Sequence, residues 1–201
     1  MVTESVDLQR ILHGLTYKEF MEISVKKIEE TNEEMLNEDE KKLYNFSKLN
    51  LHRINRIEKT YNVSDQICEQ ITKITEPQTW MVLTEDWCGD SAQNLPYIAK
   101  ISECNKNITL RILQRDKNLD IMDQYLTNDN SRSIPKLVAF DKDGIELFQW
   151  GPRPAEAQQL VIDLKASGMP KNEYTEKLHL WYGRNRGKNI ENEFVDLLKS
   201  L

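Results

Sequence analysis

The spacing of apolar residues changes near residue 77 and separates a helical segment from a mixed one. In the first segment Tyr17, Phe20 and Ile28 recur at the spacing of one helix face, and Lys and Glu fill the other face. Asn37, followed by three acidic residues, predicts the N-cap of a second helix, and Ser64 lies near the start of a third. The pattern therefore predicts helices from residue 1 to about 75, packed on the rest of the chain.

From residue 78 onward the pattern is that of strands interleaved with helices. A continuous apolar run predicts a buried central strand, and the in-and-out alternation of the next strand predicts one solvated face. The tetrapeptide Asp-Lys-Asp-Gly at 141–144 signals a tight turn between two further strands. The predicted strands are 79–84, 108–112, 137–140 and 145–150, and the predicted helices are 88–104, 118–126 and 155–166.

The order of these segments predicts an α/β fold with a mixed four-stranded sheet. The helix between the first two strands supplies the crossover that a parallel pair requires, whereas four residues join the last two strands, which must be antiparallel. Residues 170–201 return to helical spacing, and their apolar stripe of Leu178, Trp181 and Tyr182 is predicted to pack on the sheet-containing body rather than to form a dimer interface. We predict a helical extension over 1–76, an α/β domain over 77–168 and C-terminal helices over 169–201.

Composition and charge narrow the class of protein only a little. The chain has 201 residues, 39% of them apolar and 30% charged, and its net charge of −6 argues against a nucleic-acid partner. No apolar run is long enough to cross a membrane, and the first seven residues lack the basic and apolar stretches of a signal peptide. Cys68, Cys88 and Cys104 are too few and too scattered for a disulfide framework, so we expect a cytoplasmic location.

The most informative segment runs from Trp87 to Ser91, where the first strand gives way to a helix. A cysteine at such a junction meets unpaired N–H groups and the positive end of the helix dipole, which favour the nucleophilic thiolate. We therefore expect Cys88 to be exposed and ionised, with Ser91, one turn later, donating a hydrogen bond to it. Asp90 opposes this, because a nearby carboxylate raises the pKa of a thiol. The sequence leaves the outcome of that competition open.

Four features, in order, resemble the thioredoxin superfamily over residues 78–168: Trp87-Cys88-Gly89, Pro96, Ile134-Pro135 and Gly151. The Trp-Cys-Gly-Asp motif is similar in particular to that of bacterial thioredoxin-like proteins with extra N-terminal helices. The resemblance implies a thioredoxin fold, thiol–disulfide oxidoreductase activity, and a cis-proline that faces the catalytic sulfur and lets an extended substrate pair with the preceding backbone. The implied catalytic residues are Cys88 and Ser91, and the implied substrate groove is shaped by Trp87, Gly89, Asp90, Ile134 and Pro135.

Two departures from the thioredoxin pattern decide which chemistry to expect. Asp90 stands where thioredoxins have proline, and Ser91 stands where they have the second, resolving cysteine. Attack by Cys88 therefore stops at a mixed disulfide until another thiol arrives, as in monothiol glutaredoxin-like and bacilliredoxin-like proteins. A dithiol enzyme with its resolving cysteine replaced by serine would show the same motif. The expected partners are protein or low-molecular-weight disulfides, with a small thiol or a reductase as electron donor; no nucleic acid, membrane, metal or cofactor is expected.

Two other functions stay open. One is a redox-inactive module that holds an extended peptide in the same groove. The other is an iron–sulfur cluster shared by two subunits through Cys88 and a small thiol, as in monothiol glutaredoxins. Neither remaining cysteine is expected to resolve a mixed disulfide. Cys104 lies 16 residues further along the same predicted helix, about 24 Å away, and Cys68 is more simply a small buried hydrophobe.

The remaining charged and titratable residues of interest are assigned more ordinary roles. The histidines are predicted to be surface or capping residues rather than metal ligands: His13, His52 and His179. A basic run is predicted to be a solvated turn, with anion binding as the alternative: Arg184, Arg186 and Lys188. Arg153, just after Gly151-Pro152, is placed to approach the Cys88 thiolate and to offset Asp90.

Overall fold

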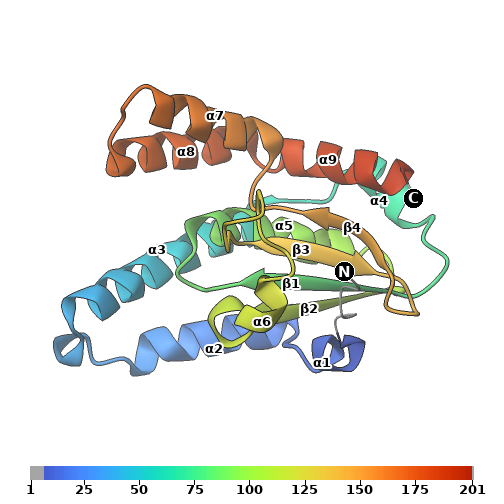
Figure 1. Cartoon of the computed structure of the whole chain (residues 1–201), viewed down its shortest axis with the longest axis horizontal. Helices are drawn as coiled ribbons and strands as arrows, with labels where there is room; N and C mark the ends of the chain where they lie inside the picture. The colour runs from blue at the N-terminus through green and yellow to red at the C-terminus, as the bar shows by residue number, and fades with distance from the viewer. Residues whose placement is uncertain (1–6, 201) are drawn as a thin grey trace.

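The computed structural model describes residues 7–200, in which helices cover both faces of a four-stranded sheet (Figure 1). The segment Met1–Val6, on which the expectation about a signal peptide mainly rests, lies outside the described residues, as does Leu201. The strands are β1 (Gln78–Thr84), β2 (Ile108–Gln114), β3 (Lys136–Phe140) and β4 (Glu146–Trp150). The α-helices are α1 (Leu8–Leu12), α2 (Tyr17–Glu30), α3 (Glu38–Thr60), α4 (Asp65–Ile71), α5 (Gly89–Ser102), α6 (Leu119–Met122), α7 (Ala155–Ala166), α8 (Lys171–Asn185) and α9 (Lys188–Lys199). Two 3₁₀ turns are η1 (Glu33–Met35) and η2 (Arg115–Lys117).

The sheet confirms the predicted α/β fold and its strand directions. Its order is β2-β1-β3-β4, with β1 parallel to β2 and antiparallel to β3, and β3 antiparallel to β4. Trp80 at the centre of β1 lies opposite Leu110 on one side and Ala139 on the other. Strand β1 is therefore an inner strand that is paired along both of its edges.

The two faces of the sheet carry separate apolar layers, since successive side chains of a strand point to opposite faces. Trp80 and Val82 face a large core formed with α5, α3, α4 and α9. Met81 and Leu83 face a smaller core closed by α1, α6 and the segment that precedes β3. The sheet is thus the middle of three layers, and the cysteine that follows β1 belongs to the smaller core.

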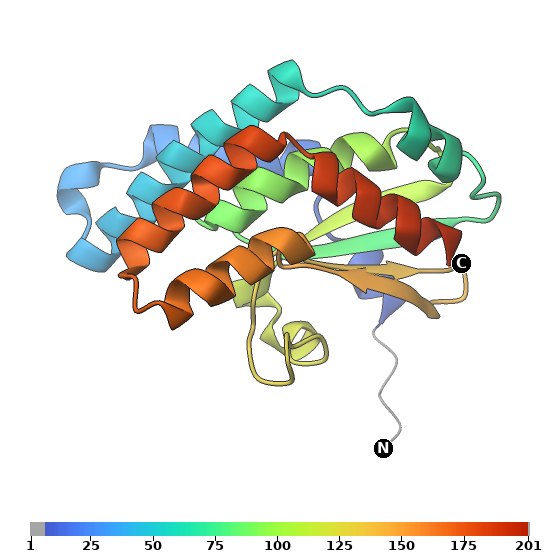
Figure 2. The ribbon, with the colours of Figure 1, turned by 90° about the horizontal axis from the view of Figure 1, so that it is seen from above.

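Helices α3 and α4 begin at the predicted N-cap positions, Asn37 and Ser64. Thr16 and Glu19 form a capping box at the start of α2, and Asn37 and Glu40 form another at the start of α3. The long α3 packs along α5, and α8 runs beside both, as Figure 2 shows from above. Within residues 7–200 no helix combines the length and the apolar content that crossing a membrane requires.

Two boundaries differ from the sequence-based prediction. The helix predicted over 118–126 is shorter, since α6 ends at Met122 and residues 123–125 form a turn and a bend. The turn predicted at Arg184, Arg186 and Lys188 is shorter than expected: only Arg186 and Gly187, both left-handed, separate the last two helices, while Arg184 lies in α8 and Lys188 begins α9. Gly187 is required there because a Cβ atom would stand 2.3 Å from the ring of Tyr97.

Candidate active site

Cys88 lies where the sequence predicts, at the N-cap of α5 directly after β1. Its backbone is extended, and its carbonyl accepts the N–H of Ala92 at 3.1 Å as the helix begins. The side chain, however, is turned inward and is only 9% exposed, and its Sγ donates to the carbonyl oxygen of Ile134 at 3.3 Å. The expectation of an exposed sulfur is therefore wrong, because α6 and the segment before β3 cover this end of the sheet.

The competition between the helix N-terminus and Asp90, which the sequence leaves open, goes against the thiolate. Burial raises the pKa of the Cys88 thiol to about 11, and the negative charge of Asp90 adds to the effect. The Ser91 hydroxyl and the N–H groups of Asp90 and Ser91 act in the opposite direction, as the helix N-terminus predicts, but they do not outweigh desolvation. At neutral pH the resting sulfur is a thiol.

Ser91 occupies the position predicted for a partner of the sulfur, yet its hydroxyl makes no hydrogen bond in the resting state. The residue is 3% exposed, and its Oγ has no hydrogen-bond partner within residues 7–200. An unpaired buried hydroxyl costs about 1–3 kcal/mol. The resting Cys88 thiol donates its hydrogen to the Ile134 carbonyl oxygen instead. The Ser91 hydroxyl can donate to the sulfur of the ionised form, and this interaction lowers the pKa of Cys88.

Asp90 is held by three elements at once. One carboxylate oxygen accepts from the Arg153 guanidinium and the other accepts from the Tyr182 hydroxyl at 2.7 Å. Asn94 donates to the backbone carbonyl of Asp90 and to the Tyr182 oxygen, at 2.8 and 3.0 Å. Arg153 thus offsets Asp90, as the sequence suggests. The stripe residue Tyr182, predicted only to pack on the body, also supplies a polar contact that its sequence position does not reveal.

A positive environment surrounds the amino end of α5. His179, predicted to be a surface residue, lies against Gly89, where a Cβ atom would stand 3.0 Å from the imidazole and 3.5 Å from Arg53. Burial and the neighbouring guanidinium groups of Arg53, Arg153 and Arg56 lower the pKa of His179 to about 4. The imidazole is therefore neutral at neutral pH, and both Arg53 and Arg153 interact with the Asp90 carboxylate. These residues come from α3, α8 and the segment before α7, and no local motif signals their meeting.

The predicted groove residues lie near the sulfur. The Ile134–Pro135 peptide bond is cis, and both residues are buried. Trp87 packs on the smaller core, and the Arg115 guanidinium lies 5.0 Å from the centre of its ring. Gly151 allows the loop before α7 to approach Pro135, because a Cβ atom there would stand 2.2 Å from the Pro135 carbonyl oxygen.

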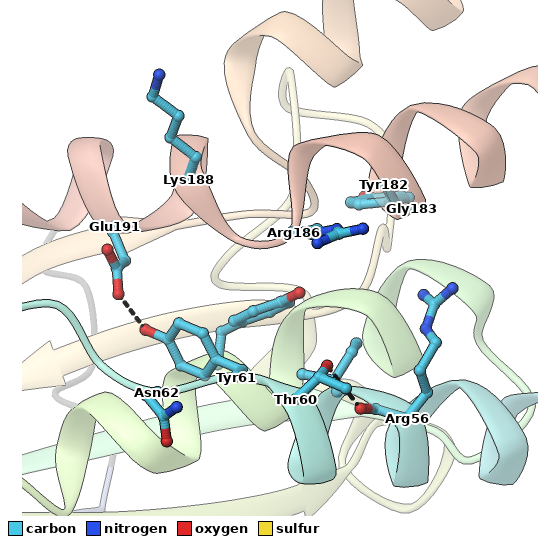
Figure 3. A pocket seen from close by; sticks show the side chains of 11 residues that line it. Arg56, Thr60, Tyr61, Asn62, Tyr182, Gly183, Arg186, Lys188 and Glu191 are labelled. Atoms are coloured by element: carbon cyan, nitrogen blue, oxygen red, sulfur yellow. Dashed lines mark hydrogen bonds between the residues drawn. The ribbon is translucent and has the colours of Figure 1, made fainter.

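A cavity lined by basic residues lies beside this site rather than at the sulfur. It has a volume of about 550 Å³ and lies between α3, α5 and the junction of α8 and α9 (Figure 3). Arg56, Arg186 and Lys188 line it, and Glu191 binds the Tyr61 hydroxyl on the opposite wall. The three cations are exposed at its rim. No group of three metal-ligating side chains forms among the residues that the structure describes.

A parallel β1–β2 pair, a cysteine opening the intervening helix and a cis-proline facing its sulfur define a thiol protein of thioredoxin fold. The chain belongs to the thioredoxin family, since the family profile described as "Thioredoxin" matches residues 36–165, more than half of its length. The match includes α3 and α4, so it begins inside the predicted N-terminal extension.

Two solved structures resemble this chain. A protein of unknown function from Pseudomonas aeruginosa is 16% identical with a TM-score of 0.59, and the alignment covers 92% of this chain and 98% of that one. An HIV epitope-scaffold is 19% identical with a TM-score of 0.55, covering 78% of this chain and 91% of that one. No curated protein matches. At these identities the likeness establishes the fold alone.

Proposed function

We propose that the protein carries out thiol–disulfide exchange through one nucleophilic sulfur, that of Cys88. The Cys88 thiolate attacks one sulfur of a substrate disulfide, the original S–S bond breaks, and the leaving thiolate takes up the proton that Cys88 lost. A second thiol then attacks the mixed disulfide and releases Cys88 in its reduced form. The substrates are protein or low-molecular-weight disulfides in the cytoplasm, and the second thiol comes from a small thiol or a reductase.

The observation that carries this proposal is the set of groups around the sulfur. Its single acceptor contact is with the Ile134 carbonyl, while the unpartnered Ser91 hydroxyl and two backbone N–H groups stabilise the charged form. An extended substrate that pairs with the backbone before Pro135 brings its disulfide to Sγ and displaces the carbonyl. The donors then hold the thiolate, and later the departing sulfur.

The raised pKa limits the rate of this reaction. With a pKa of about 11, roughly one sulfur in ten thousand is ionised at pH 7. The same burial supports a second candidate function, a redox-inactive module that holds an extended peptide in the groove. The two proposals differ in one measurable property, which is whether Cys88 forms a mixed disulfide.

The test uses a neutral pyridyl disulfide between pH 7 and 9, with mass analysis of the tryptic peptide 74–100, which contains Cys88 as its sole cysteine. Exchange activity predicts a mixed disulfide on this peptide that glutathione removes, and no product in Cys88→Ser. The variant Ser91→Cys should then gain multiple-turnover reduction of insulin, because it supplies the resolving sulfur on the same chain. Folded protein that leaves Cys88 unmodified throughout would reject the exchange reaction and favour peptide binding.

A further inference from the structure

The two cysteines outside the active site lie in direct contact. Cys68 on α4 and Cys104, just past the end of α5, place their Sγ atoms 3.2 Å apart, and both are free thiols. A disulfide bond is about 2.05 Å long, so bond formation requires the sulfur atoms to approach by about 1.2 Å. The sequence gives no hint of this pair, since 36 residues separate its members.

The backbone around the pair is well anchored. Asn105, the neighbour of Cys104, donates through its side-chain amide to the carbonyl oxygens of Ile71 and Ile74, at 2.7 and 2.8 Å. These bonds tie the end of α5 to the end of α4. The Ile71 side chain and the Ile67 side chain are fully buried in the main core, which holds α4 in place. The sulfur atoms are therefore held together by the fold and not by a chance contact of two loose side chains.

Small reagents can reach this pair more easily than they reach Cys88. Both cysteines are partly exposed, whereas Cys88 is buried. Cys104 also lines an open cavity of about 290 Å³ together with Lys100 and Glu103. The Cys104 sulfur lies within reach of both the Cys68 sulfur, at 3.2 Å, and the Lys100 carbonyl oxygen, at 3.6 Å.

We propose that Cys68 and Cys104 form a second redox site, a reversible intramolecular disulfide whose oxidant is a low-molecular-weight disulfide. The Cys68 thiolate attacks one sulfur of the oxidant and releases one thiol, and Cys104 attacks Cys68 in the mixed disulfide and releases the second thiol. Two protein thiols are oxidised, one small disulfide is reduced, and each departing thiolate takes up one of the two protons. A reducing thiol reverses both steps.

The new bond closes a loop that contains all of β1 and α5. Because it joins parts that are already in place, it stabilises the folded state by restricting the unfolded chain. For a loop of this length in a chain of this size, the oxidised protein should melt roughly 5–15 °C above the reduced protein. Cys88 lies at the opposite end of α5, about 20 Å along the helix, so its own chemistry does not take part.

The test uses Cys88→Ser, so that its outcome is independent of the proposed function. The reduced variant is treated with oxidised glutathione, quenched and digested with trypsin, which places Cys68 and Cys104 in the separate peptides 60–73 and 101–106. We expect a single product in which these peptides are cross-linked and the intact protein has lost two hydrogen atoms. Its melting temperature should rise by the stated amount and return after reduction.

The matched control is Cys68→Ser in the same background. It should yield no cross-link and no rise in melting temperature, and its Cys104 should remain free or keep an unresolved glutathione. The proposal is overturned if oxidised Cys88→Ser keeps both thiols free or carries glutathione on them without a cross-link. It is also overturned if the cross-link forms without any rise in melting temperature.

Discussion

Replacing the carboxylate beside the sulfur should make Cys88 more reactive. In Asp90→Asn the side chain keeps an oxygen for Tyr182 or Arg153 but loses the negative charge that raises the pKa of the Cys88 thiol. The Arg153 charge, no longer neutralised, then acts on the sulfur in the same direction. Both changes favour the thiolate, so the pKa should fall.

The size of this effect follows from the geometry around Asp90. A charge within about 4–6 Å shifts a pKa by about 1–3 units, and Arg153 already compensates part of the effect of Asp90, so we expect the pKa of Cys88 to fall by about one unit. Below the pKa, one unit gives about ten times more thiolate. The more acidic thiolate is also a weaker nucleophile, with a Brønsted coefficient of about 0.4–0.5, which leaves a net increase in rate of roughly threefold.

The assay is the rate of alkylation of Cys88 by iodoacetamide between pH 7 and 10, read from the mass of peptide 74–100. The matched control is Asp86→Asn, since the Asp86 side chain is 9% exposed and paired with Lys27 but does not act on Cys88. It should leave the rate unchanged. Arg153→Gln leaves Asp90 without its cation and should slow alkylation. If folded Asp90→Asn reacts at the rate of the unaltered protein or more slowly, electrostatic control of this thiol by Asp90 is refuted.

Further predictions concern neighbouring residues. Ser91→Ala removes an unpaired buried hydroxyl and should raise the free energy of unfolding by about 1 kcal/mol in urea titrations while slowing mixed-disulfide formation at Cys88. Gly151→Ala should lower the free energy of unfolding by about 2 kcal/mol or more, because its φ of +117° and the Pro135 carbonyl exclude a Cβ atom. The pKa of His179 is about 4 in the folded state, against an ordinary 6.5, so the unfolded state takes up this proton first as the pH falls from 6.5 to 4. The free energy of unfolding should therefore drop by about 2 kcal/mol over this range, and by less in His179→Gln. An anionic aromatic disulfide should modify Cys88 up to about tenfold faster than a cationic one at low salt, and Arg53→Gln should reduce this ratio.

The parts of the fold that could be predicted depend on neighbours in sequence. The N-cap at Asn37, the buried strand β1 and the turn at 141–144 are each specified by a few adjacent residues. The position of Cys88 at a helix N-terminus also follows from adjacent residues, and so does the placement of Ser91 one turn later. These predictions hold because the backbone preferences involved are short-range.

What could not be predicted depends on packing between distant segments. The N-cap position of Cys88 says which dipoles act on the sulfur, but the pKa is decided by how deeply Ile134 and α6 cover it, and desolvation outweighs the dipoles. The Tyr182–Asp90 contact joins residues 92 positions apart, and no periodic pattern distinguishes it from ordinary packing. A helix N-terminus therefore shows where a thiolate would be stabilised, and only the surrounding fold determines whether the sulfur is charged at rest. In this protein the donors lower the pKa of the Cys88 thiol, but burial and Asp90 raise it by more.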